Sequence, residues 1–295
     1  MPGFEITWLP DARPRERHLA VGEFDGVHIG HREVIHGADT VLTFEPHPRF
    51  VVAPDSAPKL LTPLTVKADL IAELAVRELV VIPFDGSFAH QSAQEFIDRE
   101  LIERLGARTV SVGENFRFGH KAKGDTTLLR SQEAFSTRVA ELVELDGEIV
   151  SSTHIRGLVT AGEVDVAHRF LGAPFQMRGT VAHGDKRGRT LGFPTANLVP
   201  DSALVVPGHG VYACRAEIGG RRHLAAVNVG VRPTFQTGRG LLVEAFLLDF
   251  DGDLDGQELR LEFLARLRGE KRFETVDALV DQMHRDVVEA RRIAA

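Results

Sequence analysis

The chain has 295 residues and a mass of 32.4 kDa, which is long for one domain and sufficient for two domains with separate cores. It is 43% hydrophobic and 26% charged, which is typical of globular proteins and excludes the disordered and fibrous classes. The formal net charge is -7 and no long Lys/Arg run is present, so the sequence does not favour nucleic acid as a partner.

Cysteine content and the first residues bear on the compartment. The single cysteine, Cys214, excludes a disulfide framework or a thiolate metal cluster within the chain. The first twenty residues lack the apolar run of a secretion signal, and no stretch approaches the length of a membrane span. We therefore expect a cytoplasmic protein with no membrane partner, and no pattern predicts an oligomeric state.

In the first half, short apolar runs alternate with helical patterns. The expected strands cover 18–24, 40–46, 78–84 and 108–115. One short helix is expected to begin near Val27, and three further helices are expected at 65–76, 92–106 and 153–172. Buried strands separated by amphipathic helices are typical of a parallel sheet with helices on its faces. The first half is therefore predicted to be a doubly wound α/β domain.

Beyond Gly172 the pattern changes to closely spaced strands that are joined by Gly-Gly and Asp-Gly turns. These strands are expected at 210–218, 221–231, 241–250 and 257–267. They predict an antiparallel sheet or small β-barrel, closed by a helix with Thr275 as its N-cap. The helical pattern stops at Gly and Pro near 172–174, so the predicted domains are 1–174 and 175–295.

The ten residues GEFDGVHIGH, from Gly22 to His31, follow the first predicted strand, at the edge where α/β sheets bind ligands. The glycines allow a ligand to approach the backbone, and a helix starting near Val27 directs N–H groups at an anion. His28 and His31 share one helical face, and such a pair could stabilise a transition state in which negative charge develops on phosphate oxygens. An ordinary polar helix start is an equal alternative from these residues alone, and a zinc site lacks the accompanying Glu or Cys ligands.

Later segments repeat this arrangement. GENFRFG at 113–119 follows an apolar run, and SSTHIR at 151–156 offers three hydroxyl groups and an arginine at a helix start. With GEFDGVHIGH and the TFEPHP run at 43–48, in this order, they resemble the FMN adenylyltransferase module of the bifunctional riboflavin kinase/FAD synthetases. The resemblance covers residues 19 to about 172.

This resemblance implies a Rossmann-like nucleotidyltransferase fold in which FMN attacks the α-phosphorus of ATP and pyrophosphate leaves. It implies that His28 and His31 stabilise the triphosphate. The residues that it places at the ligands are Gly22, Phe24, Asp25, Gly26, Asn115, Ser152, Thr153 and Arg156. Only eleven residues separate His31 from Thr43, fewer than in the family and near the minimum for a parallel crossover.

In the second half, the run GTVAHGDKRGRTLGFPTANL at 179–198 combines glycines with Lys and Arg, as in loops that wrap phosphates. Thr195 and Asn197 lie two residues apart, so in an extended segment both project to one side. Their oxygens are hard ligands of the kind that Mg²⁺ accepts. An exposed Gly/Arg-rich hairpin loop is the alternative from composition.

The same run resembles the riboflavin kinase signature, and so do the segments 227–235 and 243–250; this resemblance covers roughly 175–290. It implies a six-stranded antiparallel barrel that binds ATP with Mg²⁺ and riboflavin and transfers phosphate to the ribityl 5′-hydroxyl. Glu244 is the implied base, on a strand face with Leu242, Phe246 and Leu248; an edge-strand carboxylate facing water is the alternative. The implied ligand-binding residues are Gly184, Lys186, Arg189, Gly192, Pro194, Thr195 and Asn197, the last two also as metal ligands.

The leading hypothesis is an enzyme that makes FMN from riboflavin and ATP and then FAD from FMN and ATP. A kinase whose shortened N-terminal domain is weak or inactive is the alternative. A flavin-binding regulator without turnover is disfavoured because Glu244, Thr195, Asn197 and the histidines are all present. An aminoacyl-tRNA synthetase, suggested by His-Ile-Gly-His, is disfavoured because no lysine-rich second signature or basic tRNA surface accompanies it.

Overall fold

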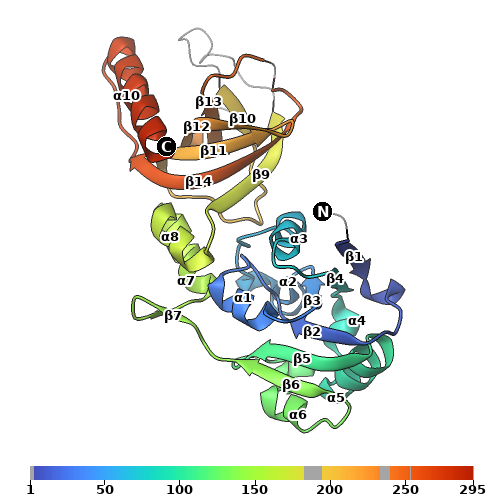
Figure 1. The fold of residues 1–295 in the computed structure, drawn as a ribbon. Helices are drawn as coiled ribbons and strands as arrows, with labels where there is room; N and C mark the ends of the chain where they lie inside the picture. The colour runs from blue at the N-terminus through green and yellow to red at the C-terminus, as the bar shows by residue number, and fades with distance from the viewer. Residues whose placement is uncertain (1–2, 183–194, 233–239, 253, 295) are drawn as a thin grey trace. The chain divides into compact units, whose positions relative to one another are not determined.

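The computed structural model describes residues 3–182, 195–232, 240–252 and 254–294 (Figure 1). The chain forms two compact units, Met1–Ser152 and Thr153–Ala295. The segment 153–172, which the sequence assigns to the first domain, falls within the second unit. The boundary between residues 174 and 175 stays a prediction.

A six-stranded parallel sheet forms the centre of the first unit, in the order β1-β4-β3-β2-β5-β6 (Figure 1). Its strands are β1 Glu5–Trp8, β2 Arg17–Val21, β3 Thr40–Glu45, β4 Glu78–Pro83, β5 Ala107–Gly113 and β6 Ser136–Ala140. The predicted doubly wound α/β fold is confirmed. Because β3 and β5 flank β2 on opposite sides, the end of β2 is the topological switch point where such sheets bind ligands.

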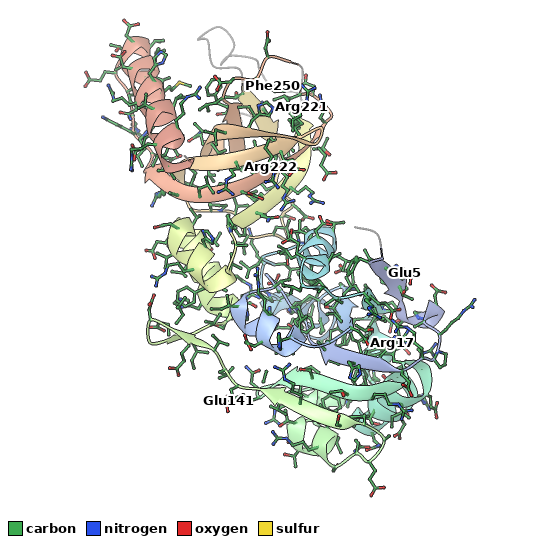
Figure 2. The ribbon with its side chains drawn as sticks, in the orientation of Figure 1. Glu5, Arg17, Glu141, Arg221, Arg222 and Phe250 are labelled. Carbon is green, nitrogen blue, oxygen red and sulfur yellow. The ribbon has the colours of Figure 1, made fainter. Side chains whose placement is uncertain are left out.

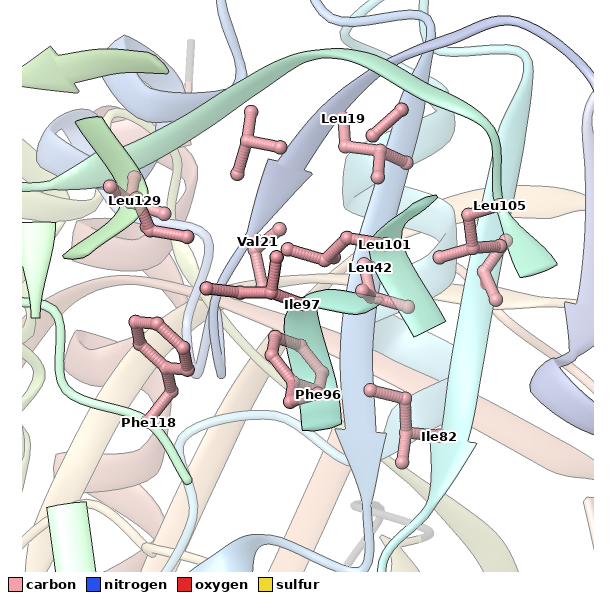
Figure 3. Packing of buried hydrophobic residues seen from close by; sticks show 14 of the residues in the cluster. Leu19, Val21, Leu42, Ile82, Phe96, Ile97, Leu101, Leu105, Phe118 and Leu129 are labelled. Carbon is pink, nitrogen blue, oxygen red and sulfur yellow. The ribbon is translucent and has the colours of Figure 1, made fainter. Parts of the chain in front are cut away.

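Helices cover both faces of this sheet because successive residues of each strand point to opposite faces. Leu19 and Val21 pack against the helical segment 96–105 on one face (Figure 3), whereas Ala20 packs with α1 and α3 on the other. The helices are α1 Ile29–Ile35, α2 Pro48–Val52, α3 Leu64–Ala72, α4 Gly86–Ala89, α5 Ala93–Glu95 continuing as the π-helix η3 Phe96–Arg104, and α6 Thr126–Arg130. Short 3₁₀ turns lie at η1 Leu9–Asp11, η2 Pro54–Ser56 and η4 His120–Ala122, and a hairpin is formed by β7 Glu144–Leu145 and β8 Glu148–Ile149.

A buried ion pair ties β2 to β4 at the amino end of the sheet, opposite the sequence motifs. Arg17 is 2% exposed, and its Nε donates to Glu78 Oε2 at 2.9 Å (Figure 2). Its Nη1 also donates to the Leu105 carbonyl at 2.8 Å. Burial acts to raise the pKa of Glu78, but the hydrogen bond and charge of Arg17 outweigh it and hold that pKa below its ordinary value. The pair therefore has a structural role.

The short segment after the histidine motif is long enough to form a parallel crossover with its own helix. The seven-residue helix α1 connects β2 to β3, which pair in parallel with Leu19 beside Thr40. The prediction of one helix over 153–172 is wrong, because α7 (Ser152–Ala161) and α8 (Val164–Leu171) are separate helices. They are divided at Gly162, whose φ of 85° lies outside the helical region.

The second unit contains a closed barrel in the order β10-β13-β12-β11-β14-β9, which confirms the predicted antiparallel barrel (Figure 1). Its strands are β9 Phe175–Ala182, β10 Thr195–Leu198, β11 Gly210–Ile218, β12 Arg221–Arg232, β13 Gly240–Leu247 and β14 Glu258–Arg268. The helix α10 (Val276–Ala294) closes the unit. Its predicted N-cap is confirmed, because the Ala278 amide donates to Thr275 Oγ1 at 3.2 Å.

Candidate functional site

The loop after β2 is wound tightly at the switch point. Three of its residues have positive φ: Phe24 at 51°, Gly26 at 88° and Val27 at 42°. A Cβ atom on Gly22 would lie 2.9 Å from the buried Phe24 ring, so any larger residue there would force that ring to shift. The non-glycine residues in left-handed conformations indicate backbone strain, which is common in ligand-binding loops.

Asp25, which the sequence assigns to ligand binding, fastens this loop to the segment before α3. Its buried carboxylate accepts hydrogen bonds from the amides of Leu61 at 2.9 Å and Thr62 at 3.0 Å. The Gly26 amide donates to Thr62 Oγ1 at 3.0 Å, and Ser152 Oγ donates to the Asp25 carbonyl at 2.9 Å. These contacts hold the loop in position, so its shape is fixed by the surrounding protein.

The two histidines of the motif lie side by side. Their rings stack with centroids 3.4 Å apart and an interplanar angle of 16°. His28 is the N-cap of α1, and its Nδ1 accepts from the His31 amide at 3.2 Å. A neutral His28 therefore carries its proton on Nε2, which makes that atom a hydrogen-bond donor. His28 is buried and His31 is half-buried.

The TFEPHP run places a third histidine, His47, just beyond the end of β3. His47 caps α2, with Nδ1 accepting from the Arg49 amide at 3.2 Å. Its Nε2 lies 2.7 Å from Oε2 of Glu23 in the motif loop. Like His28, a neutral His47 is thus held in the tautomer that donates from Nε2. The pair ties the loop after β2 to the end of β3.

A buried lysine beneath the loop was missed by the sequence analysis. Lys67 of α3 is 5% exposed, and its Nζ donates to Thr43 Oγ1 at 3.5 Å. Burial lowers the pKa of Lys67 below its ordinary value, while the carboxylates of Asp25, Glu45 and Glu23 act in the opposite direction. The signal was a lysine among the apolar residues of 64–72, which the helix buries on most sides.

We expect the Lys67→Met substitution to change the pH dependence of stability. Lys67 binds its proton less tightly when folded than when unfolded, so the unfolded chain holds more protons at pH values between the two pKa values. Wild-type stability therefore rises with pH through that window, and a neutral methionine has no such contribution. In urea unfolding between about pH 7 and pH 10.5, the free energy of unfolding of wild type should increase relative to that of the variant as the pH rises. The control is Lys59→Met at an exposed lysine, which should show no such pH dependence. If the difference in unfolding free energy between wild type and Lys67→Met is the same at every pH, the expectation is wrong.

The other assigned residues of the first motif set come from the end of β5 and from the first turns of α7. Asn115 is exposed just beyond β5, with its Oδ1 close over Gly113. Ser152 belongs to the first unit, whereas Thr153 and Arg156 belong to the second. Arg156 Nη1 donates to Thr153 Oγ1 at 3.3 Å within α7.

An aromatic cavity of about 650 Å³ opens near the carboxyl ends of β3, β4 and β5. Its phenylalanines are Phe44, Phe84, Phe88, Phe96, Phe116 and Phe118. Polar groups at the same cavity include His90 and His120, whose rings stack 5.1 Å apart, and Arg117. Six aromatic rings suit a flat, fused-ring ligand. The sequence signal was the 18 phenylalanines in a chain with one tryptophan and one tyrosine.

In the second unit, the barrel register brings Glu244 between two asparagines. On β13, Glu244 pairs directly with Asn197 of β10 on one side and with Asn228 of β12 on the other. Thr195 pairs with Phe246 in the same way. Because β13 lies between two strands of a closed barrel, the edge-strand alternative for Glu244 is wrong.

The strand alternation directs Glu244 away from the barrel interior. Val243, Ala245 and Leu247 are buried inside the barrel, whereas Glu244 and Phe246 line an external cavity of about 740 Å³. Thr195 and Asn228 line the same cavity, together with α10 and the segment 268–273. Thr195 and Glu244 therefore face one cleft.

Two hard oxygen donors lie on β10 beside Glu244. Asn197 is buried, and its Oδ1 has no hydrogen-bond partner within the described part of the chain. An unsatisfied buried oxygen is costly unless a ligand completes it, so this atom and the Thr195 hydroxyl fit a hard cation such as Mg²⁺. The predicted phosphate-loop residues Gly184, Lys186, Arg189, Gly192 and Pro194 lie outside the described residues.

A charged segment after β14 forms the far wall of the cavity and was also missed by the sequence analysis. Arg268 Nη2 and Nε donate to the carboxylate of Asp286 on α10 at 2.8 and 3.0 Å. Arg268 and Lys271 each lie 5.7 Å from the centre of the Phe273 ring. The signal was the run of charged residues directly after the last strand.

Two kinds of feature are absent from residues 3–182, 195–232, 240–252 and 254–294. No helix there is both long enough and apolar enough to cross a membrane. No group of three or more His, Cys, Asp or Glu side chains that could hold a metal ion was found among these residues.

Comparisons with known proteins cover both units. The FAD synthetase family model matches residues 11–154, and the riboflavin kinase family model matches residues 171–294. A crystal structure described as a macrolide-efflux protein from Streptococcus pneumoniae has a TM-score of 0.87 at 31% identity, covering 98% of both chains. The same fold therefore extends over nearly the whole length.

Curated relatives agree with both family models. The bifunctional riboflavin kinase/FMN adenylyltransferase of Bacillus subtilis is 38% identical over 290 residues, covering 93% of this chain and 91% of its own. The protein of the same name from Escherichia coli K12 is 38% identical over 287 residues, covering 92% and 91%. With relatives this similar along its whole length, the chain belongs to the bifunctional riboflavin kinase/FMN adenylyltransferase family.

Proposed function

We propose that this chain phosphorylates riboflavin to FMN in its barrel domain and adenylylates FMN to FAD in its α/β domain. The observation that carries the proposal is that relatives named for both activities match more than nine tenths of the chain, across both motif sets. We place the domains at 1–174 and 175–295, because β9 begins at Phe175. The substrates are riboflavin, FMN and ATP, and the proposed location is the cytoplasm.

In the kinase reaction, Glu244 is the base. The riboflavin 5′-hydroxyl gives its proton to the Glu244 carboxylate, its oxygen bonds to the γ-phosphorus of ATP, and the bond to ADP breaks. Thr195 and Asn197 would hold Mg²⁺, which neutralises phosphate charge when bound. The cavity of about 740 Å³ beneath α10 has room for the flavin beside Glu244.

In the kinase, we propose that ATP is bound by the sequence-motif residues Gly184, Lys186, Arg189, Gly192 and Pro194. Backbone N–H groups and cationic side chains in such a run suit the triphosphate.

In the adenylylation reaction, a phosphate oxygen of FMN bonds to the α-phosphorus of ATP, and the bond to pyrophosphate breaks. The Nε2–H of His28, with His31 stacked beside it, would donate to phosphate oxygens as their charge grows. The aromatic cavity would bind the isoalloxazine ring, with Arg117, His90 and His120 as polar groups at its wall. Asn115, Ser152, Thr153 and Arg156 are proposed to hold the ligands, on the family motif.

The loop residues Gly22, Phe24, Asp25 and Gly26 contribute mainly by shaping the binding site. Their contacts fix the backbone on which His28 and His31 are placed. A preformed site of this kind lowers the cost of ordering the reacting groups.

Separation of flavins by chromatography tests the proposal. Purified protein incubated with riboflavin, ATP and Mg²⁺ should yield FMN and then FAD, and supplied FMN with ATP should release pyrophosphate. FMN as the only product would support the kinase-only alternative, in which the α/β domain is inactive. Neither product would refute both activities.

A further inference from the structure

We infer that Asn228 is a positioning residue for the kinase reaction, which orients the carboxylate of Glu244 toward the riboflavin hydroxyl. The inference rests on the proposed kinase function and goes beyond it, because Asn228 lies within the motif segment 227–235 but has no role assigned to it there. The observation behind it is the barrel register, which pairs Asn228 directly with Glu244.

Asn228 and Glu244 are neighbours because they occupy directly paired positions on the adjacent strands β12 and β13. Directly paired residues of antiparallel strands have their Cβ atoms about 5 Å apart on the same face, within reach of an amide and a carboxylate. Both side chains line the cavity that also contains Thr195 and Phe246. The adjacent pair along these strands is Ala226 with Phe246, so no other polar group of β12 competes at that level.

The two asparagines that flank Glu244 differ in burial and in the group that they present: Asn197 an oxygen for a cation, and Asn228 N–H donors for a carboxylate. Asn197 is buried with an unsatisfied oxygen, which suits a cation. Asn228 is only partly buried, and it lines the cavity directly beside Glu244. Its amide carries two N–H donors that a neighbouring carboxylate can accept.

Two further carboxylates line the cavity, and both have charged or ionisable neighbours. Asp286 accepts hydrogen bonds from Arg268, and Glu270 lies 3.7 Å from His209. A base must be held in place by a donor that does not remove its basicity, and a neutral amide meets this need better than a cation. Asn228 supplies such an amide directly beside Glu244.

The primary test is steady-state kinetics of FMN formation by the full chain. Asn228→Leu keeps the size of the side chain and removes its donors. We expect kcat to fall about 10- to 100-fold, as for loss of an orienting contact, with KM for riboflavin and ATP within twofold of wild type. Asn228→Ser, which keeps a donor, should recover part of the loss. The control is Arg222→Ala, on the same strand face at the far end of β12 (Figure 2), with kinetics like wild type.

A double-mutant cycle decides whether Asn228 acts through Glu244. In the Glu244→Gln background, Asn228→Leu should cause little further loss, because the group that it orients is gone. A full additional 10- to 100-fold loss would overturn the inference. So would a rise in KM for riboflavin at unchanged kcat, which indicates direct substrate contact, or wild-type kinetics of Asn228→Leu.

The adenylylation of supplied FMN by each variant reports that the chain is folded. If wild-type protein forms no FMN, the proposed kinase function fails before Asn228 is tested. If wild type is active and the Asn228 variants follow none of the expected changes, only the inference fails.

Discussion

The Glu244→Gln variant should form FMN about 10²- to 10⁴-fold more slowly than wild type, the range expected for loss of a general base. The substitution is nearly isosteric, and Glu244 lies on a cavity wall and not in the barrel interior. The fold should therefore be unchanged. The measurement is the initial rate of FMN formation from riboflavin and ATP, followed by chromatography.

The same preparation provides its own control. Adenylylation of supplied FMN by Glu244→Gln should match wild type, because His28 and His31 belong to the other unit. Asn197→Ala should likewise abolish FMN formation and spare adenylylation, because it removes an oxygen proposed to hold the cation. Kinase rates near wild type in both variants would show that the assignment of this site is wrong.

Much of the architecture could be predicted because hydrophobic periodicity reports the environment of each element. Buried runs such as 78–84 predicted parallel strands, and the closely spaced strands beyond residue 210 predicted the antiparallel barrel. The short edge strand β1 (Glu5–Trp8) was missed, because its four residues are mostly exposed and give no apolar run. The break at Gly162 was missed because a single glycine is tolerated in many helices.

The candidate sites were predictable within each strand but not between strands. A spacing of two residues places Thr195 and Asn197 on one face, as alternation requires. The pairing of Glu244 with Asn228 depends on the register of β13 with β12, and its pairing with Asn197 depends on the register of β13 with β10. Neither follows from local pattern. The sequence also treated Glu244 as part of an apolar face, whereas that face lines the cavity beneath α10.

The partners of Asp25 show a similar limit. A motif identifies which residues recur near a ligand, but it does not separate those that touch the ligand from those that hold the loop. The Asp25 carboxylate binds the amides of Leu61 and Thr62, which are 36 and 37 residues away along the chain. Such contacts depend on tertiary structure and cannot be derived from spacing.

Replacing both His28 and His31 with alanine should lower FAD formation from FMN by at least about 10²-fold, as for removal of donors that stabilise growing charge on phosphate. FMN formation from riboflavin should be unchanged. The measurement is pyrophosphate release with FMN and ATP. Unchanged FAD synthesis would refute the assignment of the histidines.

His28 requires a more careful substitution, because it also caps α1 through Nδ1. Loss of an N-cap costs about 1 kcal/mol, so alanine removes a structural contact together with the donor. Asparagine places its Oδ1 near the position of the histidine Nδ1 and is itself a favourable cap, but it has no atom that corresponds to Nε2. His28→Asn should therefore unfold at the same urea concentration as wild type and still lose FAD synthesis as His28→Ala does. Full activity of His28→Asn would mean that His28 serves the helix and not the phosphates.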